Sequence, residues 1–146
     1  MCILDISKTL MYDFHYNYIK KKYKDKAKLL FTDTDSLMYV IETEDVYDDT
    51  GNDVERFDTS DYKAGHPSGI RTEIKKKVPG MMKDEARGQQ IEEYVGLSAE
   101  LYSYKMHKDE KEEKKCKGIT KAVTKNTISH EDYKTVCLKN LKKNQR

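Results

Sequence analysis

Residues 27–41 read Ala-Lys-Leu-Leu-Phe-Thr-Asp-Thr-Asp-Ser-Leu-Met-Tyr-Val-Ile, and this stretch decides the fold. Its two short apolar runs, 27–32 and 37–41, are typical of two strands joined by a tight connection. Since side chains alternate along an extended backbone, Asp33 and Asp35 are expected to point the same way. The stretch therefore predicts a β-hairpin with two carboxylates at its tip, an arrangement that suits a hard metal ion.

The aspartate pair has three interpretations from the residues alone. Asp and Ser are common turn residues, so the first is a polar hairpin turn without chemistry. The second is a calcium loop with Asp33, Asp35 and Glu44 as ligands. It is disfavoured, because Leu37 and Met38 stand where such a loop needs an oxygen ligand and a glycine. The third is a two-metal site for phosphoryl transfer, which needs carboxylates on a rigid element.

The composition limits the size of the core. Of the 146 residues, 36% are apolar and 37% are charged. Typical globular domains have roughly 45–50% apolar and about 25% charged residues. One modest domain with a thin core is therefore expected, and the composition also leaves open a chain that does not fold stably.

Charged residues of each sign are clustered along the chain, although the net charge is small. The formal net charge is +2, but lysines gather in four clusters and acidic residues in one. The lysine clusters span 20–28, 75–77, 114–117 and 139–143, and the acidic residues gather at 42–61. Each lysine cluster alone is typical of a solvated face, whereas several of them beside a metal-binding hairpin favour a phosphate-bearing partner.

The cysteine, histidine and hydropathy patterns indicate in which cellular compartment the protein is expected. Cys2, Cys116 and Cys137 are odd in number and widely spaced, which favours a reducing compartment over a disulfide framework. The four histidines form no zinc pattern. The first residues lack the features of a signal peptide, and no apolar run reaches transmembrane length. We therefore expect a soluble intracellular protein, nuclear or cytoplasmic, without a membrane partner.

The N-terminal region is expected to be helical. Apolar residues recur at spacings of three and four over residues 2–22. The pattern ends in Lys20, Lys21 and Lys22, where cations complement the helix dipole. No capping residue precedes it, so the helix is expected to continue something longer.

Weaker patterns predict the remaining elements. Before residue 90 they are a short acidic helix over 44–53, a loop over 56–73 and an edge strand within 75–84. An ambiguous segment at 91–100 is followed by a strand over 101–106 and an exposed turn at 107–115. One or two short strands are expected after Gly118, then a helix capped by Ser129 and Asp132, and a fraying basic tail at 139–146. Together they predict an α+β fold. Its N-terminal helix packs on a small antiparallel sheet around the 27–42 hairpin, and a mixed region follows.

The segment Phe31-Thr32-Asp33-Thr34-Asp35-Ser36 resembles motif C of the family B DNA polymerases, a hairpin in the palm domain. The helix at 2–23 resembles the palm helix before that hairpin. Residues 96–104 and 115–119 resemble the segment that runs from the late palm into the thumb. The combination is similar to the protein-primed branch, which serves phages, linear plasmids and Polinton/Maverick transposons, and we favour the transposon-type members.

The resemblance implies roles for the hairpin residues. Asp35 would be the main metal ligand and Asp33 the second acid of a catalytic site for two Mg²⁺ ions. Thr34 and Ser36 would shape the turn, and Thr34 would also be among the residues near the DNA.

The same resemblance implies DNA contacts outside the hairpin. Tyr102 would be the tyrosine of the Lys-x-Tyr motif that contacts the primer end. The lysine position of this motif holds Glu100, whose carboxylate would repel a phosphate. Lys105 is a candidate to replace the missing lysine. Lys115 and Lys117 would lie near the base of the thumb and face the duplex.

The resemblance also has gaps. No segment of the 146 residues resembles motif B or the exonuclease carboxylates. Residues 5–12 only faintly echo motif A and continue a helical pattern. The chain is therefore expected to hold a partial palm domain at 1–110 and the start of a thumb domain at 111–146.

These expectations define the functional hypothesis. The chain is expected to be a fragment of a DNA-directed DNA polymerase with Mg²⁺ as cofactor. Its partners would be primer–template DNA, deoxynucleoside triphosphates and a terminal protein. Alone it is expected to be inactive, because one carboxylate pair cannot hold both metal ions. The alternative is a non-catalytic DNA-binding remnant of a transposon polymerase that uses its lysine clusters.

Overall fold

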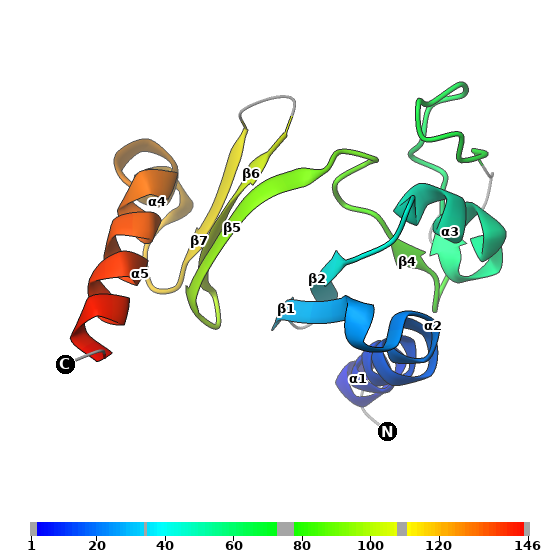
Figure 1. Cartoon of the computed structure of the whole chain (residues 1–146), viewed down its shortest axis with the longest axis horizontal. Coiled ribbons are helices and arrows are strands. Elements are labelled where there is room, and N and C mark those ends of the chain that lie inside the picture. The colour runs from blue at the N-terminus through cyan, green and yellow to red at the C-terminus, as the bar shows by residue number, and fades with distance from the viewer. Residues whose placement is uncertain (1–2, 34, 73–77, 108–110, 145–146) are drawn as a thin grey trace. The chain divides into compact units, whose positions relative to one another are not determined.

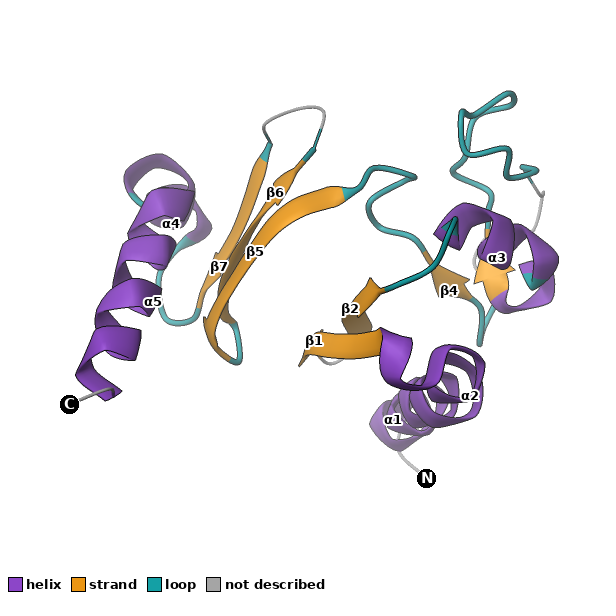
Figure 2. Ribbon diagram, in the orientation of Figure 1, coloured by secondary structure: helices purple, strands orange, loops and turns teal. Residues whose placement is uncertain are grey.

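The computed structural model describes residues 3–33, 35–72, 78–107 and 111–144. It contains helices and three small sheets, which confirms the predicted α+β class (Figures 1 and 2). The chain divides into two compact units. The first unit is Met1–Leu29 with Tyr39–Gly88, and the second unit is Leu30–Met38 with Gln89–Arg146.

One long helical run opens the first unit and confirms the helix predicted over residues 2–22. It consists of α1 (Ile3–Asp13), the π-helical segment η1 (Phe14–Ile19) and α2 (Lys20–Tyr23). Lys24 ends the run with a φ of 52°, and the short 3₁₀ segment η2 (Lys24–Lys26) leads into the hairpin.

The hairpin predicted over residues 27–42 is confirmed. Its strands β1 (Ala27–Asp33) and β2 (Ser36–Ile41) pair in a two-stranded sheet. The base of the hairpin belongs to the first unit, and the helical run packs on it, as predicted. The cluster that they form consists of buried Tyr18, Ile19, Tyr23 and Ala27 with partly buried Phe14, Tyr39, Ile41 and Phe57.

A short acidic helix follows the hairpin, as the 44–53 pattern predicts. This helix, α3 (Val46–Asn52), is capped by Asp45, whose side chain accepts a hydrogen bond from the backbone N–H of Tyr47 at 2.8 Å. Asp is a favourable N-cap because it satisfies a backbone donor that the helix leaves unpaired. The 3₁₀ segment η3 (Val54–Arg56) completes this part of the chain.

Two very short strands close the first unit. β3 (Phe57–Asp58) pairs in parallel with β4 (Met82–Lys83). The loop predicted over 56–73 therefore begins with a strand, and turns make up most of its described remainder. Of the strand predicted within 75–84, only β4 forms among the described residues, and 75–77 lie outside them.

A three-stranded antiparallel sheet forms the centre of the second unit. Its strands are β5 (Ile91–Ser98), β6 (Leu101–Met106) and β7 (Glu112–Cys116), in that order. The strand predicted over 101–106 is confirmed, and the ambiguous segment before it is mostly strand. The predicted palm–thumb boundary between residues 110 and 111 falls between β6 and β7, which pair in this sheet, and it stays a prediction.

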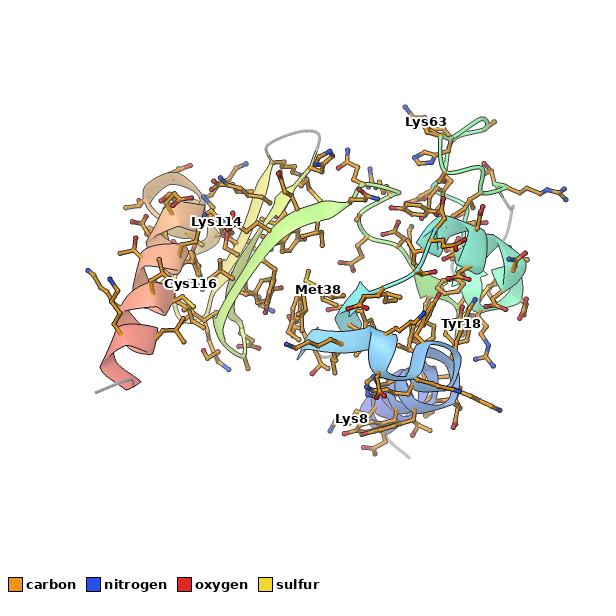
Figure 3. The ribbon with its side chains drawn as sticks, viewed as in Figure 1. Lys8, Tyr18, Met38, Lys63, Lys114 and Cys116 are labelled. Atoms are coloured by element: carbon orange, nitrogen blue, oxygen red, sulfur yellow. The ribbon has the colours of Figure 1, made fainter. Side chains whose placement is uncertain are left out.

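The exposed turn predicted at 107–115 is wrong from residue 112 onward, where β7 begins. The charged composition concealed the strand, because its charges are paired with neighbours in the fold. Glu112 lies 3.6 Å from the Nζ of Lys105 and 3.3 Å from that of Lys114. Lys114 also donates to the backbone oxygen of Ile128 at 2.7 Å (Figure 3).

The strands predicted after Gly118 are also wrong, because the chain forms the helix α4 (Lys121–Thr127) there. Ile119 and Val123, which suggested strands, are 42% and 47% exposed. The buried side chain on α4 is that of Thr124, whose hydroxyl donates to the carbonyl oxygen of Thr120 at 3.1 Å. The apolar residues in this segment therefore do not indicate which side chains are buried.

The C-terminal helix α5 (His130–Asn144) begins where the sequence predicts. The backbone N–H of Ser129 donates to Asp132 Oδ2 at 2.8 Å, and the N–H of Asp132 donates to Ser129 Oγ at 3.3 Å. These reciprocal bonds form the predicted capping box. The helix continues to Asn144 through most of the tail that was predicted to fray at 139–146; the fraying itself stays a prediction, and residues 145–146 lie outside the described residues. No helix in the described parts of the chain is both long and apolar enough to cross a membrane.

Candidate active site at the hairpin tip

The tip of the hairpin lies in the second unit and carries the two predicted metal ligands. Asp33 ends β1 with its side chain 19% exposed, whereas Asp35 is exposed in the turn. The hydroxyl of Ser36 donates to the backbone oxygen of Asp33 at 3.2 Å and so ties the two ends of the turn together. Thr34, the predicted DNA-contacting residue between the aspartates, lies outside the described residues.

An aromatic cluster supports the hairpin tip. The ring of Phe31 stacks on that of Tyr102 with centroids 4.3 Å apart, and on that of Tyr94 with centroids 5.8 Å apart. The ring of Tyr104 stacks against that of Tyr102 with centroids 6.4 Å apart. All four rings are half-buried. Stacked aromatic pairs add packing energy beyond their buried area, so this cluster holds β1 on the tyrosine-bearing face of the sheet.

The pairing of β6 with β7 explains how the cluster forms. Tyr102 and Tyr104 lie two residues apart and so share one face of β6, while Ser103 between them faces α5. The register sets Tyr102 opposite Lys115 and Tyr94 opposite Tyr104. One face of the sheet therefore collects the aromatic residues and a lysine.

Lys115 connects this face of the sheet to the hairpin. Its ammonium group forms an ion pair with Asp33 Oδ2, although the two residues are 82 positions apart in the chain. The hydrogen bond to Asp33 raises the pKa of Lys115 above its ordinary value, so the lysine is charged. The structure thus brings together three of the predicted site residues, Asp33, Tyr102 and Lys115.

The other two predicted DNA-contacting lysines are engaged elsewhere. Lys105 shares the α5-facing side of β6 with Ser103, and its Nζ lies 3.6 Å from Glu112. Lys117 pairs with Glu100 at 2.8 Å and keeps 76% of its side chain exposed. Glu100 itself sits in the β5–β6 turn with a φ of 58°. The DNA contacts of these lysines stay predictions.

The donor set at the tip fits a magnesium ion that is held only in part by this chain. Mg²⁺ is commonly bound by one or two carboxylates, with water and substrate phosphates as the other ligands. Asp33 and Asp35 can supply those carboxylates. No group of three or more potential metal-binding side chains occurs among the residues that the structure describes. The tip therefore supplies two carboxylates rather than a closed cage of ligands.

A buried polar cluster beneath α5 is not evident from the sequence. His130 and Ser103 are both fully buried, and His130 Nδ1 lies 2.8 Å from Ser103 Oγ. The other ring nitrogen of His130 lies 3.3 Å from the carboxylate of Glu93 on β5. Because Ser103 has no exposed surface, it cannot meet a substrate, and the cluster serves to fix α5 on the sheet. The capping sequence locates His130 at the helix start, but nothing in the sequence indicates its partner.

A second carboxylate pair that the sequence analysis did not single out lies in the first unit. Lys22 Nζ lies 3.4 Å from Asp49 and 2.5 Å from Asp53, and both aspartates also accept tyrosine hydroxyls. Tyr23 donates to Asp49 at 2.9 Å, and Tyr18 (labelled in Figure 3) donates to Asp53 at 2.7 Å. The spacing of four residues within an acidic segment is a signal that could have identified this pair.

Comparisons with known proteins return no relative of this chain. No family model matches it, and neither the curated proteins nor the solved structures include a match. The resemblance to family B polymerases therefore stands as the basis for a proposal.

Proposed function

We propose that this chain is part of a DNA-directed DNA polymerase of the protein-primed family B, of the Polinton/Maverick type. It would contribute the late palm and the start of the thumb. One observation carries the proposal. The segment that resembles motif C and the segment that resembles the Lys-x-Tyr region contact each other, through the stacking of Phe31 on Tyr102 at 4.3 Å. Such a contact supports a common site for metal ligands and primer.

The hairpin residues would bind the metal and the neighbouring residues would bind the primer. Asp35 and Asp33 would hold Mg²⁺ at the tip, where Asp35 is exposed and Asp33 is held in place by Ser36. Bound Mg²⁺ supplies positive charge to the attacking and leaving oxygens of a nucleotidyl transfer. Tyr102 would contact the primer end, since its ring lies beside the strand that ends in Asp33.

The chain by itself is proposed to be inactive. One carboxylate pair leaves the second metal ion and the incoming nucleotide without their protein ligands, and most of the electrostatic stabilisation of the transition state is then lost. Primer extension with the purified chain should give no product. Template-dependent extension that Asp35→Ala abolishes would overturn the inactivity. The same proposal implies that deoxynucleoside triphosphates and a terminal protein are partners of the chain. It also implies an intracellular location.

The test of the proposal is whether DNA binding depends on magnesium. The affinity of the purified chain for a fluorescent primer–template is measured by anisotropy, with Mg²⁺ and with a monovalent salt of equal ionic strength. Mg²⁺ should raise the affinity of the wild type, because the metal joins the carboxylates to the DNA phosphate. The variant Asp35→Asn should lose this gain, whereas Asp48→Asn, on the exposed side of α3, should keep it.

The same experiment separates the proposal from the non-catalytic alternative. A DNA-binding remnant would show affinity that falls with salt but does not respond to Mg²⁺ or to Asp35→Asn. Equal affinities under both conditions would therefore favour the remnant. The exposed lysines of α4 and α5, such as Lys125 and Lys139, are the observation that keeps this alternative in view.

A further inference from the structure

The ion pair between Lys115 and Asp33 joins a lysine of β7 to a proposed metal ligand of β1. The side chain of Lys115 is 39% exposed and that of Asp33 is 19% exposed, so solvent reaches the pair in part. Ion pairs that solvent screens contribute little to stability. The contact is therefore one that a stronger cation can displace.

A divalent cation and the ammonium group compete for the same carboxylate. Asp33 Oδ2 accepts from Lys115 Nζ, and a metal ion bound to that oxygen would face a unit positive charge at contact distance. Like charges this close repel each other even in water. Binding of the metal at Oδ2 therefore requires Lys115 to move away from that oxygen.

We propose that Lys115 is an exchangeable cation of this site. It neutralises Asp33 when no divalent cation is bound, and it turns to a backbone phosphate of the nucleic acid when the metal takes the carboxylate. The inference rests on the proposed function and extends it, because it couples occupancy of the metal site to binding of a phosphate.

The position of Lys115 suits this role better than those of the other two lysines. Its register partner across the sheet is Tyr102, the proposed primer contact, so the ammonium group and the ring lie on one face. Lys105 occupies the opposite face with Glu112. Lys117 lies 2.8 Å from Glu100, whose carboxylate repels phosphate. Lys115 thus takes the place of the lysine that position 100 lacks.

The first half of the inference is tested by metal binding. Mn²⁺ is titrated into the purified full chain, and the free ion is followed by electron paramagnetic resonance. Lys115→Gln removes the competing charge and should bind Mn²⁺ roughly threefold to tenfold more tightly than the wild type. Lys115→Arg keeps the charge and should bind as the wild type does. Lys105→Gln is the matched control, since it removes a lysine of the same sheet from the opposite face, and it should leave the affinity unchanged.

The second half is tested by DNA binding. For the wild type in Mg²⁺, the slope of log affinity against log salt should exceed that of Lys115→Gln by about 0.9, the contribution of one phosphate contact. Without divalent cations the two slopes should agree, because Asp33 then holds the lysine. Lys115→Arg should restore the slope in Mg²⁺.

The outcomes separate the two proposals. If Asp33→Asn binds Mn²⁺ as tightly as the wild type does, the proposed function fails at its metal site. If Asp33→Asn weakens Mn²⁺ binding but Lys115→Gln leaves it unchanged, the metal site stands and the exchange is overturned. Equal salt slopes for the wild type and Lys115→Gln in Mg²⁺ would overturn the transfer of Lys115 to phosphate.

Discussion

Two pairs of aspartates, one in each unit, each have a lysine partner, yet they differ in the contacts that the lysine makes. In the first unit, Lys22 contacts both Asp49 and Asp53. In the second unit, Lys115 contacts Asp33, while Asp35 stands exposed at the hairpin tip. The comparison shows that a carboxylate pair near a lysine is not by itself a functional site.

Side-chain hydroxyl groups bond both aspartates of the first unit. The hydroxyls of Tyr18, Tyr23 and Thr43 all donate to the aspartates of the first unit, at 2.7–2.9 Å. Burial raises the pKa of Asp53, but the bonds from Lys22 and Tyr18 outweigh it and hold that pKa below its ordinary value. Both aspartates of this pair accept hydrogen bonds within their own unit, and a ligand that binds them competes with those bonds.

The largest effect is expected from breaking the engaged pair. Asp53→Ala removes the acceptor of Tyr18 and one partner of Lys22, and it leaves a partly buried hydroxyl without its bond. We expect the free energy of unfolding to fall by about 1–3 kcal/mol. Urea denaturation followed by circular dichroism measures this loss. The control Asp48→Asn, on the exposed side of the same helix, should stay within about 0.5 kcal/mol of the wild type. A cooperative transition in the wild type is itself required, because its absence would mean that the chain does not fold stably.

The engaged pair also predicts how stability depends on pH. The folded-state pKa values of Asp49 and Asp53 lie below the unfolded value of about 3.9, so the unfolded chain binds more protons in acid. Their contribution is present above that pH and is lost as the pH falls through the folded-state values. The urea midpoint should therefore drop below about pH 4, and the drop should be smaller in Asp53→Asn. An equal drop in both proteins would assign the acid sensitivity to other carboxylates.

The open pair should respond differently to the same treatment. Asp33→Asn removes an ion pair with a lysine whose side chain is 39% exposed, so its effect on the free energy of unfolding should be less than half of that of Asp53→Ala. The same substitution should nevertheless weaken Mn²⁺ binding, which Asp53→Asn should leave unchanged. If Asp33→Asn destabilises the chain as strongly as Asp53→Ala does, the hairpin pair is structural and the comparison between the units fails.

Local patterns in the sequence predicted the elements whose stability is local. The hairpin, the N-terminal helix and the capping box at Ser129 all form as expected, because each depends on residues close together in the chain. The strand β7 and the helix α4 were missed for the opposite reason. β7 is stabilised by pairing with β6, and α4 exposes Val123 to solvent while burying Thr124. Such contacts are not encoded in a local pattern.

The candidate site likewise has a part that local sequence predicts and a part that depends on distant contacts. Asp33 and Asp35 are neighbours in the chain, so their spacing alone placed them at one hairpin tip. The stacking of Tyr102 on Phe31 and the ion pair of Lys115 with Asp33 depend on the register of a distant sheet. The resemblance named both residues but gave them contacts with DNA only. Sequence therefore located the proposed metal ligands, whereas the structure was needed to find the lysine that pairs with one of them.

A third carboxylate–lysine pair is more exposed than the other two. Glu100 and Lys117 approach to 2.8 Å, but 76% of the lysine side chain is exposed, and salt and water screen such a contact. Lys117→Gln should therefore change the free energy of unfolding by about 0.5 kcal/mol or less, the smallest effect of the three pairs. Urea denaturation at low and high salt measures it, with the double variant Lys117→Gln and Glu100→Gln closing the cycle. If the coupling energy of Lys117 with Glu100 is larger than that of Lys22 with Asp53, the exposure of an ion pair does not determine how much the pair contributes to stability. The turn at Glu100 then depends on its ion pair as well as on the backbone bond from the N–H of Lys117 to the oxygen of Glu100 at 3.1 Å.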